Sequence, residues 1–219
     1  MQHDAYFRSQ IDNVYFDTPT DELVIASLEK PNYKYKVRAR SYGQASAGKV
    51  FLEIKSKLDG VVYKRRAALS LADYYAFLDG KKAVNSQVMR EVDFLFRTKQ
   101  LGPNLFISYD RLSYAACDGS DLRITFDTNL RSRENNLAIE MSSACTPYFD
   151  EPTCIMEIKT RGGMPPWLTE SLSAQRIYPS SFSKYGRIFQ KYQAQAHQDN
   201  LLDSTPLSKY AGQRGVVYA

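Results

Sequence analysis

Basic side chains alternate with apolar ones in the segment around residue 38. Lys36, Arg38 and Arg40 are separated by Val37 and Ala39. A β-strand turns successive side chains to opposite faces, so the three charges would share one face and the apolar residues the other. Fixed positive charge along a sheet is unfavourable unless water or an anion faces it. The first chemical hypothesis is therefore a ligand that carries several negative charges.

A predicted hairpin extends this pattern. The dipeptide Asp59-Gly60 stands between two alternating segments and indicates a two-residue turn. Counting back from the turn places Lys55 opposite Lys64, and Glu53 opposite Arg66. Two facing lysines destabilise a strand pair unless an anion lies between them. A solvated face of flexible lysines is the alternative interpretation, since exposed charge on one side of an antiparallel sheet is ordinary.

Further strand-like segments also carry charge on one face. Their same-face groups are Tyr109 with Arg111, Arg123 with Thr125 and Asp127, and Glu157 with Lys159. If the sheet closes and helices cover its apolar outside, these faces line a polar bore. Arginine and lysine in a bore suit phosphate oxygens. Glu157, with Glu53 as a weaker candidate, could hold a divalent cation that bridges phosphates; alternatively, Glu157 forms an ion pair with Lys159 or a bore arginine.

Composition narrows the possible chemistry. The chain has 219 residues and a net charge of +5, so local clustering rather than bulk charge carries the signal. The two histidines, His3 and His197, lie near the ends, which disfavours histidine-centred catalysis and a histidine-based zinc site. The three cysteines lack metal-ligand spacing and favour a reducing, cytoplasmic location. No secretory signal is expected, and no direct membrane anchor, because long apolar runs are missing.

The elements that must position these residues follow from periodicity and turn signals. Strands are predicted at 13–17, 33–42, 50–58, 61–66, 105–116, 121–128 and 154–160. Helices are predicted at 22–28, 70–78, 86–98, 165–173 and 183–194, the first capped by Thr20 or Asp21. The charge run formed by Arg131, Arg133 and Glu134 is interpreted as a solvated loop.

These elements predict one α+β domain. Its expected architecture is an antiparallel β-tunnel, a closed or nearly closed barrel with a polar, basic interior, flanked by helices. The domain is expected to span residues 1–195. Residues 196–219 are expected to form a polar, loosely ordered C-terminal tail.

The ordered set of motifs resembles a known family. The motifs are Lys-Val-Arg-Ala-Arg-Ser-Tyr-Gly (36–43), Leu-Glu-Ile-Lys (52–55), Val-Tyr-Lys-Arg-Arg (62–66), Tyr-Asp-Arg (109–111), Leu-Arg-Ile-Thr-Phe-Asp (122–127), Met-Glu-Ile-Lys (156–159) and Ser-Phe-Ser-Lys-Tyr-Gly (181–186). Together they resemble the VTC domain, the polyphosphate polymerase domain of the triphosphate tunnel metalloenzyme superfamily. The resemblance runs from about Asn13 to Tyr192.

The resemblance implies a transferase that moves the γ-phosphate of ATP onto a polyphosphate chain with the help of Mn²⁺ or Mg²⁺. By position, it implies phosphate binding by Arg38, Arg40, Lys55, Lys64, Arg111, Arg123 and Lys159, with Lys36 and Arg66 as neighbours. It also implies metal binding by Glu157, and a Lys184 that reaches over the tunnel mouth. Arg38, Arg40, Lys159 and Lys184 are the residues expected to act in catalysis. The transfer needs charge neutralisation and in-line positioning rather than a strong base.

One departure and several alternatives accompany this hypothesis. Family members usually begin with a further strand that bears an Arg/Glu/Lys pattern, whereas only residues 1–12 precede the first predicted strand here. We therefore expect a tunnel that lacks one wall strand, which a partner protein or membrane subunit could supply. The alternatives are a non-catalytic module that binds polyphosphate or inositol phosphates, and a tunnel-type triphosphatase. Nucleic acid is not an expected partner, because the aromatic residues mostly take apolar faces.

Overall fold

One antiparallel sheet organises the molecule. The computed structural model describes residues 1–43, 48–81, 86–140 and 145–204. The strands are β1 (Gln2–Asp17), β2 (Tyr33–Tyr42), β3 (Val50–Leu58), β4 (Val61–Leu69), β5 (Gly102–Ala115), β6 (Arg123–Arg133), β7 (Thr146–Pro147) and β8 (Ile155–Lys159). The helices are α1 (Glu22–Glu29), α2 (Leu71–Leu78), α3 (Gln87–Lys99), α4 (Pro166–Ala174) and α5 (Lys184–Ser204).

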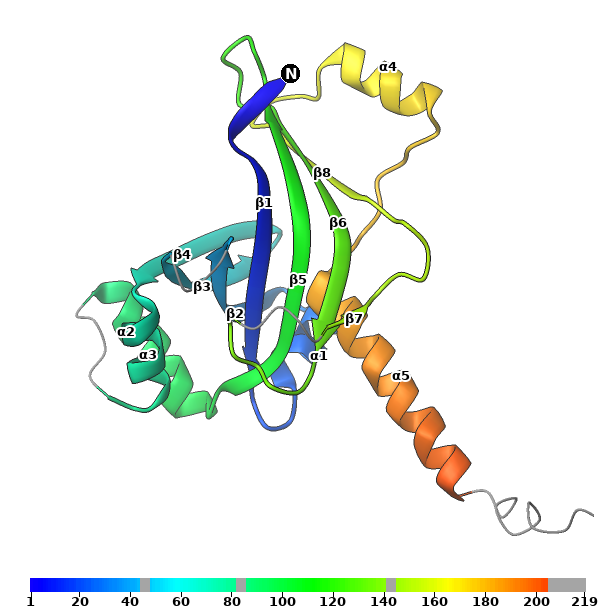
Figure 1. Ribbon diagram of the computed structural model, residues 1–219. Helices are drawn as coiled ribbons and strands as arrows, with labels where there is room; N and C mark the ends of the chain where they lie inside the picture. The colour runs from blue at the N-terminus through cyan, green and yellow to red at the C-terminus, as the bar shows by residue number, and fades with distance from the viewer. Residues whose placement is uncertain (44–47, 82–85, 141–144, 205–219) are drawn as a thin grey trace, which may run out of the picture.

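The strands form a curved layer with helices on its outside. Their order is β4-β3-β2-β1-β5-β6, and β6 pairs with both β7 and β8. Figure 1 shows β3 and β4 turning away from the long strands β1, β5 and β6, so the sheet bends around a concave face. The α+β class and the antiparallel sheet are confirmed. Closure of the sheet into a complete tunnel stays a prediction.

The hairpin register agrees with the sequence prediction. Lys55 lies opposite Lys64, and Glu53 lies opposite Arg66. Both turn residues of Asp59-Gly60 have positive φ, at 45° and 87°, which a type I′ hairpin turn requires. Glycine has no Cβ to oppose such a φ, and aspartate tolerates it better than most residues. Local turn chemistry therefore fixes which face of β3 and β4 carries the lysines.

Several predicted boundaries were wrong. Strand β1 begins at Gln2 rather than Asn13, because its N-terminal part pairs with β5 on the far side of a bulge. Strand β6 continues to Arg133, which pairs with Phe106, so the loop predicted around Arg131 is strand. Arg133 is buried, and its guanidinium lies 3.6 Å from the centre of the Phe106 ring. The charge run resembles a solvated loop in the sequence, and only the pairing of β5 with β6 shows that it is a strand.

The C-terminal helix is also longer than predicted. Helix α5 runs to Ser204, so residues 197–204 are helical rather than loosely ordered. Residues 205–219 lie outside the described residues. Figure 1 shows the later turns of α5 extending away from the sheet. Among the described residues, no helix combines the length and the apolar character needed to cross a membrane.

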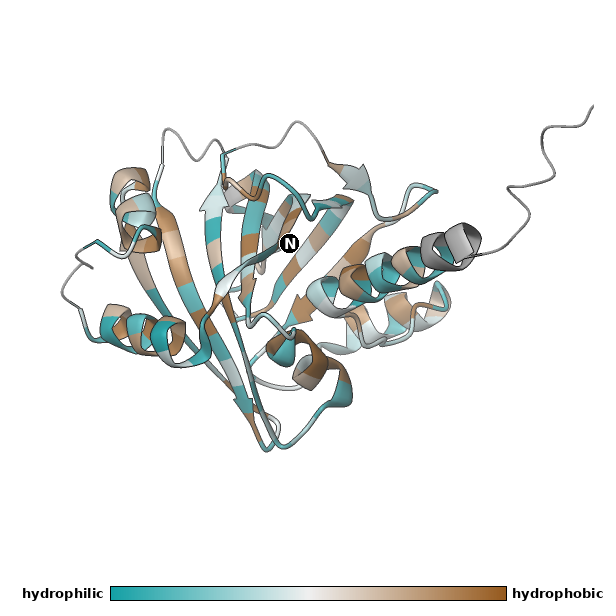
Figure 2. Cartoon of the chain, turned by 90° about the horizontal axis from the view of Figure 1, so that it is seen from below, coloured by the Kyte–Doolittle hydropathy of each residue, from teal (hydrophilic) through white to brown (hydrophobic). Residues whose placement is uncertain are grey.

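The main core lies on the convex face of the sheet. Helices α2 and α3 pack there against β1–β4, and Figure 2 shows apolar residues along these facing surfaces. Val37 and Ala39 are fully buried in this core, as the alternation of β2 predicts. A smaller apolar cluster brings Leu168 of α4 together with Leu122 and Ile124, at the start of β6. Helices α2, α3 and α4 therefore cover the apolar, convex side of the sheet, and the basic side chains lie on the concave face.

Helix α5 covers one end of the concave face. Its residues Tyr185 and Ile188 pack with Ile11, Leu105 and Ile107 of β1 and β5. This apolar contact was not predicted, because the charged faces were expected to line the whole bore. The concave face is therefore divided into a region of apolar contact with α5 and a region of charged side chains.

Asp17, at the end of β1, joins α1 to α5. Its carboxylate accepts hydrogen bonds from the backbone N–H groups of Leu23 and Val24 at 2.8 and 3.0 Å. It also accepts one from the hydroxyl of Tyr185 at 2.6 Å. Asp21 precedes the helix but makes no side-chain capping bond, so Asp17 supplies the cap that the sequence assigned to Thr20 or Asp21.

Candidate functional site

The strand register gathers the predicted basic residues on the concave face. Lys36, Lys55 and Lys64 form one row across β2, β3 and β4. On the same face, toward the other end of the strand order, Arg111 lies opposite Asp127 and Arg123 lies opposite Lys159. Lys184 reaches the same face from the first turn of α5, where its Nζ lies 2.7 Å from Asp127. We divide the site into two walls, according to how these charges are compensated.

The first wall, called the basic wall, contains six predicted residues and one buried carboxylate. Its basic residues are Lys36, Arg38, Arg40, Lys55, Lys64 and Arg66. Glu53 lies between Arg38 and Lys64, with its oxygens 2.7 and 2.6 Å from their nitrogens, and its side chain is 0% exposed. Burial alone would raise the pKa of Glu53, but Arg38, Arg40 and Lys64 lower it to about 2. Glu53 is therefore a buried counter-ion of Arg38 and Lys64, and metal binding by Glu53 stays a prediction.

The two other arginines of the basic wall, Arg40 and Arg66, have neutral or aromatic partners. Arg40 donates from Nε to the amide oxygen of Asn13 at 2.9 Å and from Nη2 to the hydroxyl of Tyr109 at 3.2 Å. The Arg66 guanidinium lies 4.9 Å from the centre of the Phe51 ring. Such contacts orient a guanidinium without cancelling its charge. The positive charges of these two arginines are therefore not neutralised by these contacts.

Two lysines of this wall have lowered pKa values. Burial is the main cause that lowers the pKa of Lys36, and neighbouring cations including Lys55 lower it further. The pKa of Lys55 is lowered by the same two causes, burial first and then the charge of Arg38. Lys36 donates to the hydroxyl of Ser183 at 2.9 Å, a neutral partner. An anion bound between these lysines would relieve the repulsion between them.

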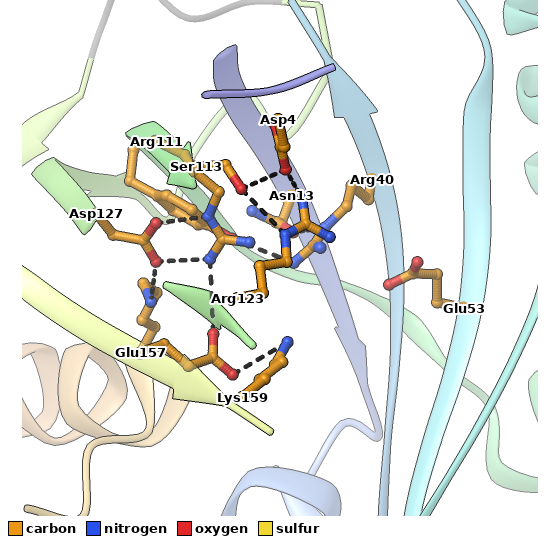
Figure 3. A network of polar contacts seen from close by, with 12 residues as sticks. Asp4, Asn13, Arg40, Glu53, Arg111, Ser113, Arg123, Asp127, Glu157 and Lys159 are labelled. Atoms are coloured by element: carbon orange, nitrogen blue, oxygen red, sulfur yellow. Dashed lines mark hydrogen bonds and ion pairs between the residues drawn. The ribbon is translucent and has the colours of Figure 1, made fainter. Parts of the chain in front are cut away.

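The second wall, called the paired wall, places a carboxylate beside each of its cations. Arg111 forms a two-point contact with Asp127, with donor–acceptor distances of 2.6 and 2.7 Å. Burial alone would raise the pKa of Asp127, but the hydrogen bond from Arg111 and the charge of Lys184 lower it. Figure 3 shows this group on the opposite side of the concave face from Glu53.

The other two cations of the paired wall have separate acids. Arg123 lies 2.6 Å from Asp4 and donates from Nε to Ser113 at 3.0 Å. Lys159 lies 3.2 Å from Glu157, and Arg111 lies 3.8 Å from the same carboxylate (Figure 3). The ion pairs that the sequence considered for Glu157 are therefore present.

Glu157 is also the acid best placed to reach a divalent cation. Its side chain is 44% exposed, whereas Asp127 and Glu53 are fully buried in ion pairs. Within the described residues, no group of three acidic, histidine or cysteine side chains forms a metal cage. The residues fit a hard cation that binds one carboxylate and takes its other oxygens from phosphate and water, as Mg²⁺ commonly does. A cation held in this way would neutralise phosphate charge and orient the reacting oxygens.

Two tyrosines connect the walls and the helix. Tyr15 accepts a hydrogen bond from Arg38 at 3.1 Å, and its ring stacks on Tyr185 with a centroid distance of 4.4 Å. The Tyr109 ring lies 4.7 Å from Lys184 Nζ and 5.3 Å from the guanidinium of Arg111. The tyrosines thus hold cations from β2, β5 and α5 in one arrangement.

Sequence reasoning missed the partners of these cations. Asp4, Asn13 and Tyr15 all lie on β1 and contact site arginines, although the sequence prediction assigned no role to this strand. The alternation Ile11, Asn13, Tyr15 was a usable signal, because its period of two turns all three toward one face. Asp4 offered no such signal, since a register shift separates it from the regular pairing of β1 with β5.

A protein-family model matches the sequence of this chain. The model of the VTC domain matches residues 2–192, most of the chain. The chain belongs to the VTC family. The VTC family is part of the triphosphate tunnel proteins. This group includes enzymes, its members typically use divalent metals, and the VTC domain implies phosphate ligands.

Comparison with solved structures supports the fold of this VTC chain. A protein from Bacillus halodurans, named as a provisional adenylate cyclase, matches with a TM-score of 0.52 and 15% identity over 82% of this chain and 81% of that chain. The PH1819 protein from Pyrococcus horikoshii OT3 matches with a TM-score of 0.39 and 15% identity, over 84% and 85% of the respective chains. No curated protein matches the VTC chain. At this level of identity the first likeness shows the shared fold.

Proposed function

We propose that this chain is a polyphosphate polymerase that uses ATP and a divalent metal ion, Mn²⁺ or Mg²⁺. The observation that carries the proposal is the basic wall, where six basic side chains share one face with the single carboxylate Glu53, as far as the described residues extend. A linear chain of phosphates offers repeated anionic oxygens that match such a surface. The VTC family membership supports the same ligand class.

The transfer itself follows from charge and position. A terminal oxygen of polyphosphate, already ionised, attacks the γ-phosphorus of ATP. The bond between that phosphorus and the β–γ bridging oxygen breaks, ADP leaves with the electron pair, and the acceptor grows by one phosphate. Arg38 and Arg40 on one wall, and Lys159 and Lys184 on the other, would stabilise the charge on the transferred group. Glu157 would hold the metal ion.

The reaction can proceed without a strong general base, because the attacking oxygen carries no proton. The protein's contribution is to align two polyanions that repel each other in water. Asp127 holds Arg111 and Lys184 in position. Binding therefore needs little reorganisation of these two cations, while the basic wall supplies most of the attraction.

The test is synthesis of polyphosphate from ATP in the presence of Mn²⁺. We expect product with the wild type and loss of product in Arg38→Ala and Lys159→Ala. The matched control is Arg65→Ala: Arg65 lies next to Lys64 but faces the convex side, where it pairs with Glu91. A folded wild type that makes no product in this assay would contradict the polymerase proposal.

Binding measurements separate the alternatives. Affinity for tripolyphosphate should fall as salt rises, because the contacts are ionic and largely screened at high ionic strength. Binding without synthesis or cleavage would identify a phosphate-binding module. Release of phosphate from tripolyphosphate or ATP, without chain growth, would identify a triphosphatase. Failure to bind tripolyphosphate at low salt would contradict all three functions.

A further inference from the structure

A row of oxygen-bearing side chains crosses the paired wall. Thr125 of β6 lies directly opposite Ser113 of β5 on one side and opposite Glu157 of β8 on the other. The row on one side pairs Arg111 with Asp127, and the row on the other side pairs Arg123 with Lys159. The oxygen row therefore lies between two rows that each contain at least one cation.

Thr125 differs from its neighbours because its hydroxyl has no partner. The residue is 5% exposed, and its Oγ1 makes no hydrogen bond within the described part of the chain. Ser113, in the same row, donates to Asp4 at 2.6 Å and accepts from Arg123. A buried hydroxyl without a partner lowers folding stability, because burial removes its hydrogen bonds to water. A valine of nearly the same shape would avoid that cost, so the hydroxyl points to a use other than folding.

We propose that the Thr125 hydroxyl is a second protein ligand, beside Glu157, for the divalent cation of the site. Directly opposite side chains on paired strands have Cβ atoms about 4.5–5.5 Å apart, a spacing that one cation bound to both oxygens can bridge. Hydroxyl and carboxylate oxygens are the hard donors that Mn²⁺ and Mg²⁺ accept. The inference rests on the proposed function, which supplies the phosphate oxygens that complete the coordination.

Glu157 can exchange its ion pair with Lys159 for contact with a metal ion. Glu157 pairs with Lys159, whose side chain is 64% exposed, so this pair can open at little cost. Phosphate on Lys159 and the two arginines would remove the positive charge that otherwise repels a metal ion. Glu157 already faces the same side as Thr125, so a side-chain rotation is enough to turn its carboxylate toward the cation. The metal and the phosphate are thereby predicted to bind more tightly together than separately.

The experiment is a titration of Mn²⁺ followed by electron paramagnetic resonance, with tripolyphosphate bound and with Mn²⁺ alone. We expect Thr125→Val to weaken Mn²⁺ affinity about tenfold in the presence of tripolyphosphate, which corresponds to about 1.4 kcal/mol. Thr125→Ser keeps the oxygen and should stay within about twofold of the wild type. Equal Mn²⁺ affinity in Thr125→Val and the wild type would overturn the inference.

Two further measurements exclude other roles for the hydroxyl. Thermal unfolding without ligands should leave Thr125→Val at least as stable as the wild type, since no hydrogen bond is lost. A clear loss of stability would instead assign a structural role. Metal-free tripolyphosphate affinity should be unchanged in Thr125→Val, and a decrease there would make the hydroxyl a phosphate donor and overturn the inference. If the wild type binds Mn²⁺ but not tripolyphosphate, the proposed function is contradicted. The titration of Thr125→Val with Mn²⁺ alone then still decides whether Thr125 is a metal ligand.

Discussion

The two walls of the concave face use acidic residues differently. In the basic wall, Glu53 is the one carboxylate among six predicted cations in the described part of the chain, and it is shared between Arg38 and Lys64. In the paired wall, four cations stand beside three carboxylates, so the charges nearly balance. The basic wall therefore carries the excess charge that attracts a polyanion. The paired wall carries pre-oriented groups among which a metal ion can be held.

The two walls should also contribute differently to ligand binding: the basic wall to affinity, and the paired wall to orientation. Excess charge raises the association rate and affinity for any polyanion, and it acts at long range. Charge that is already paired contributes less attraction, but it fixes where each nitrogen lies before the ligand arrives. Substitutions in the basic wall should therefore weaken binding first. Substitutions in the paired wall should impair transfer more than binding.

The largest expected effect is on stability and comes from Glu53→Gln. The change leaves Arg38, half of a buried ion pair, without its counter-charge, and it also removes the partner of Lys64. Breaking a buried pair from one side costs about 3–5 kcal/mol. Urea unfolding should show a loss of this size. The control Glu91→Gln, which loses an exposed pair with Arg65, should change the unfolding free energy by less than about 1 kcal/mol.

Asp127→Asn should have a smaller effect, about 1–3 kcal/mol. Both partners of Asp127 retain a second contact: Arg111 lies near Glu157, and Lys184 lies over the ring of Tyr109. Urea unfolding of Asp127→Asn and Glu53→Gln under one condition makes the comparison. A larger loss for Asp127→Asn would contradict the view that the basic wall depends on a single carboxylate.

Alternation in the sequence placed the basic residues on one face of the sheet, but it did not identify their partners. Lys55 and Lys64 could be placed face to face because the Asp59-Gly60 turn fixes the register within a few residues. The contact between Arg111 and Asp127 depends on how β5 and β6 pair, which the loop between these strands leaves open. Beyond that contact, a bulge between Ser108 and Asp110 shifts the register of Arg131 and Arg133. A local pattern cannot reveal such a shift, because one extra residue exchanges the faces of everything beyond it.

The same reason explains the error around Arg133. A run of charges in a sequence usually indicates solvent, yet Arg133 is buried over Phe106 and donates to the backbone carbonyl of Ala138 at 2.6 Å. These contacts join segments that are distant or irregular in the sequence. The fold class, most strands and the basic residues were therefore predictable from alternation. The counter-ions and the contacts of α5 required the three-dimensional arrangement.

Acid should destabilise the folded chain mainly through the basic wall. The pKa of Glu53 is about 2 in the folded chain, against an ordinary value of 4.5. Because the folded value is the lower one, this stabilisation is fully present above the ordinary pKa and is lost as the pH falls toward the folded value. Unfolding free energy measured by urea across this range should fall less steeply in Glu53→Gln. Parallel curves for the two proteins would show that other carboxylates, such as Asp127, dominate the acid response.

The smallest expected effect is at alkaline pH and concerns Tyr15. Burial alone would raise the pKa of Tyr15, but Arg38, Lys36 and Arg40 lower it to about 8. Above that pH the phenolate adds a second internal anion to the basic wall and competes with phosphate for Arg38. Tripolyphosphate affinity should therefore fall by about two- to fivefold between about pH 7 and pH 9, and it should fall less in Tyr15→Phe. Some decrease should remain in the variant, because the pKa values of Lys36 and Lys55 are also lowered. An identical decrease in both proteins, with no phenolate absorbance appearing near pH 8 in the wild type, would show that Tyr15 stays neutral and that lysine deprotonation alone weakens the basic wall.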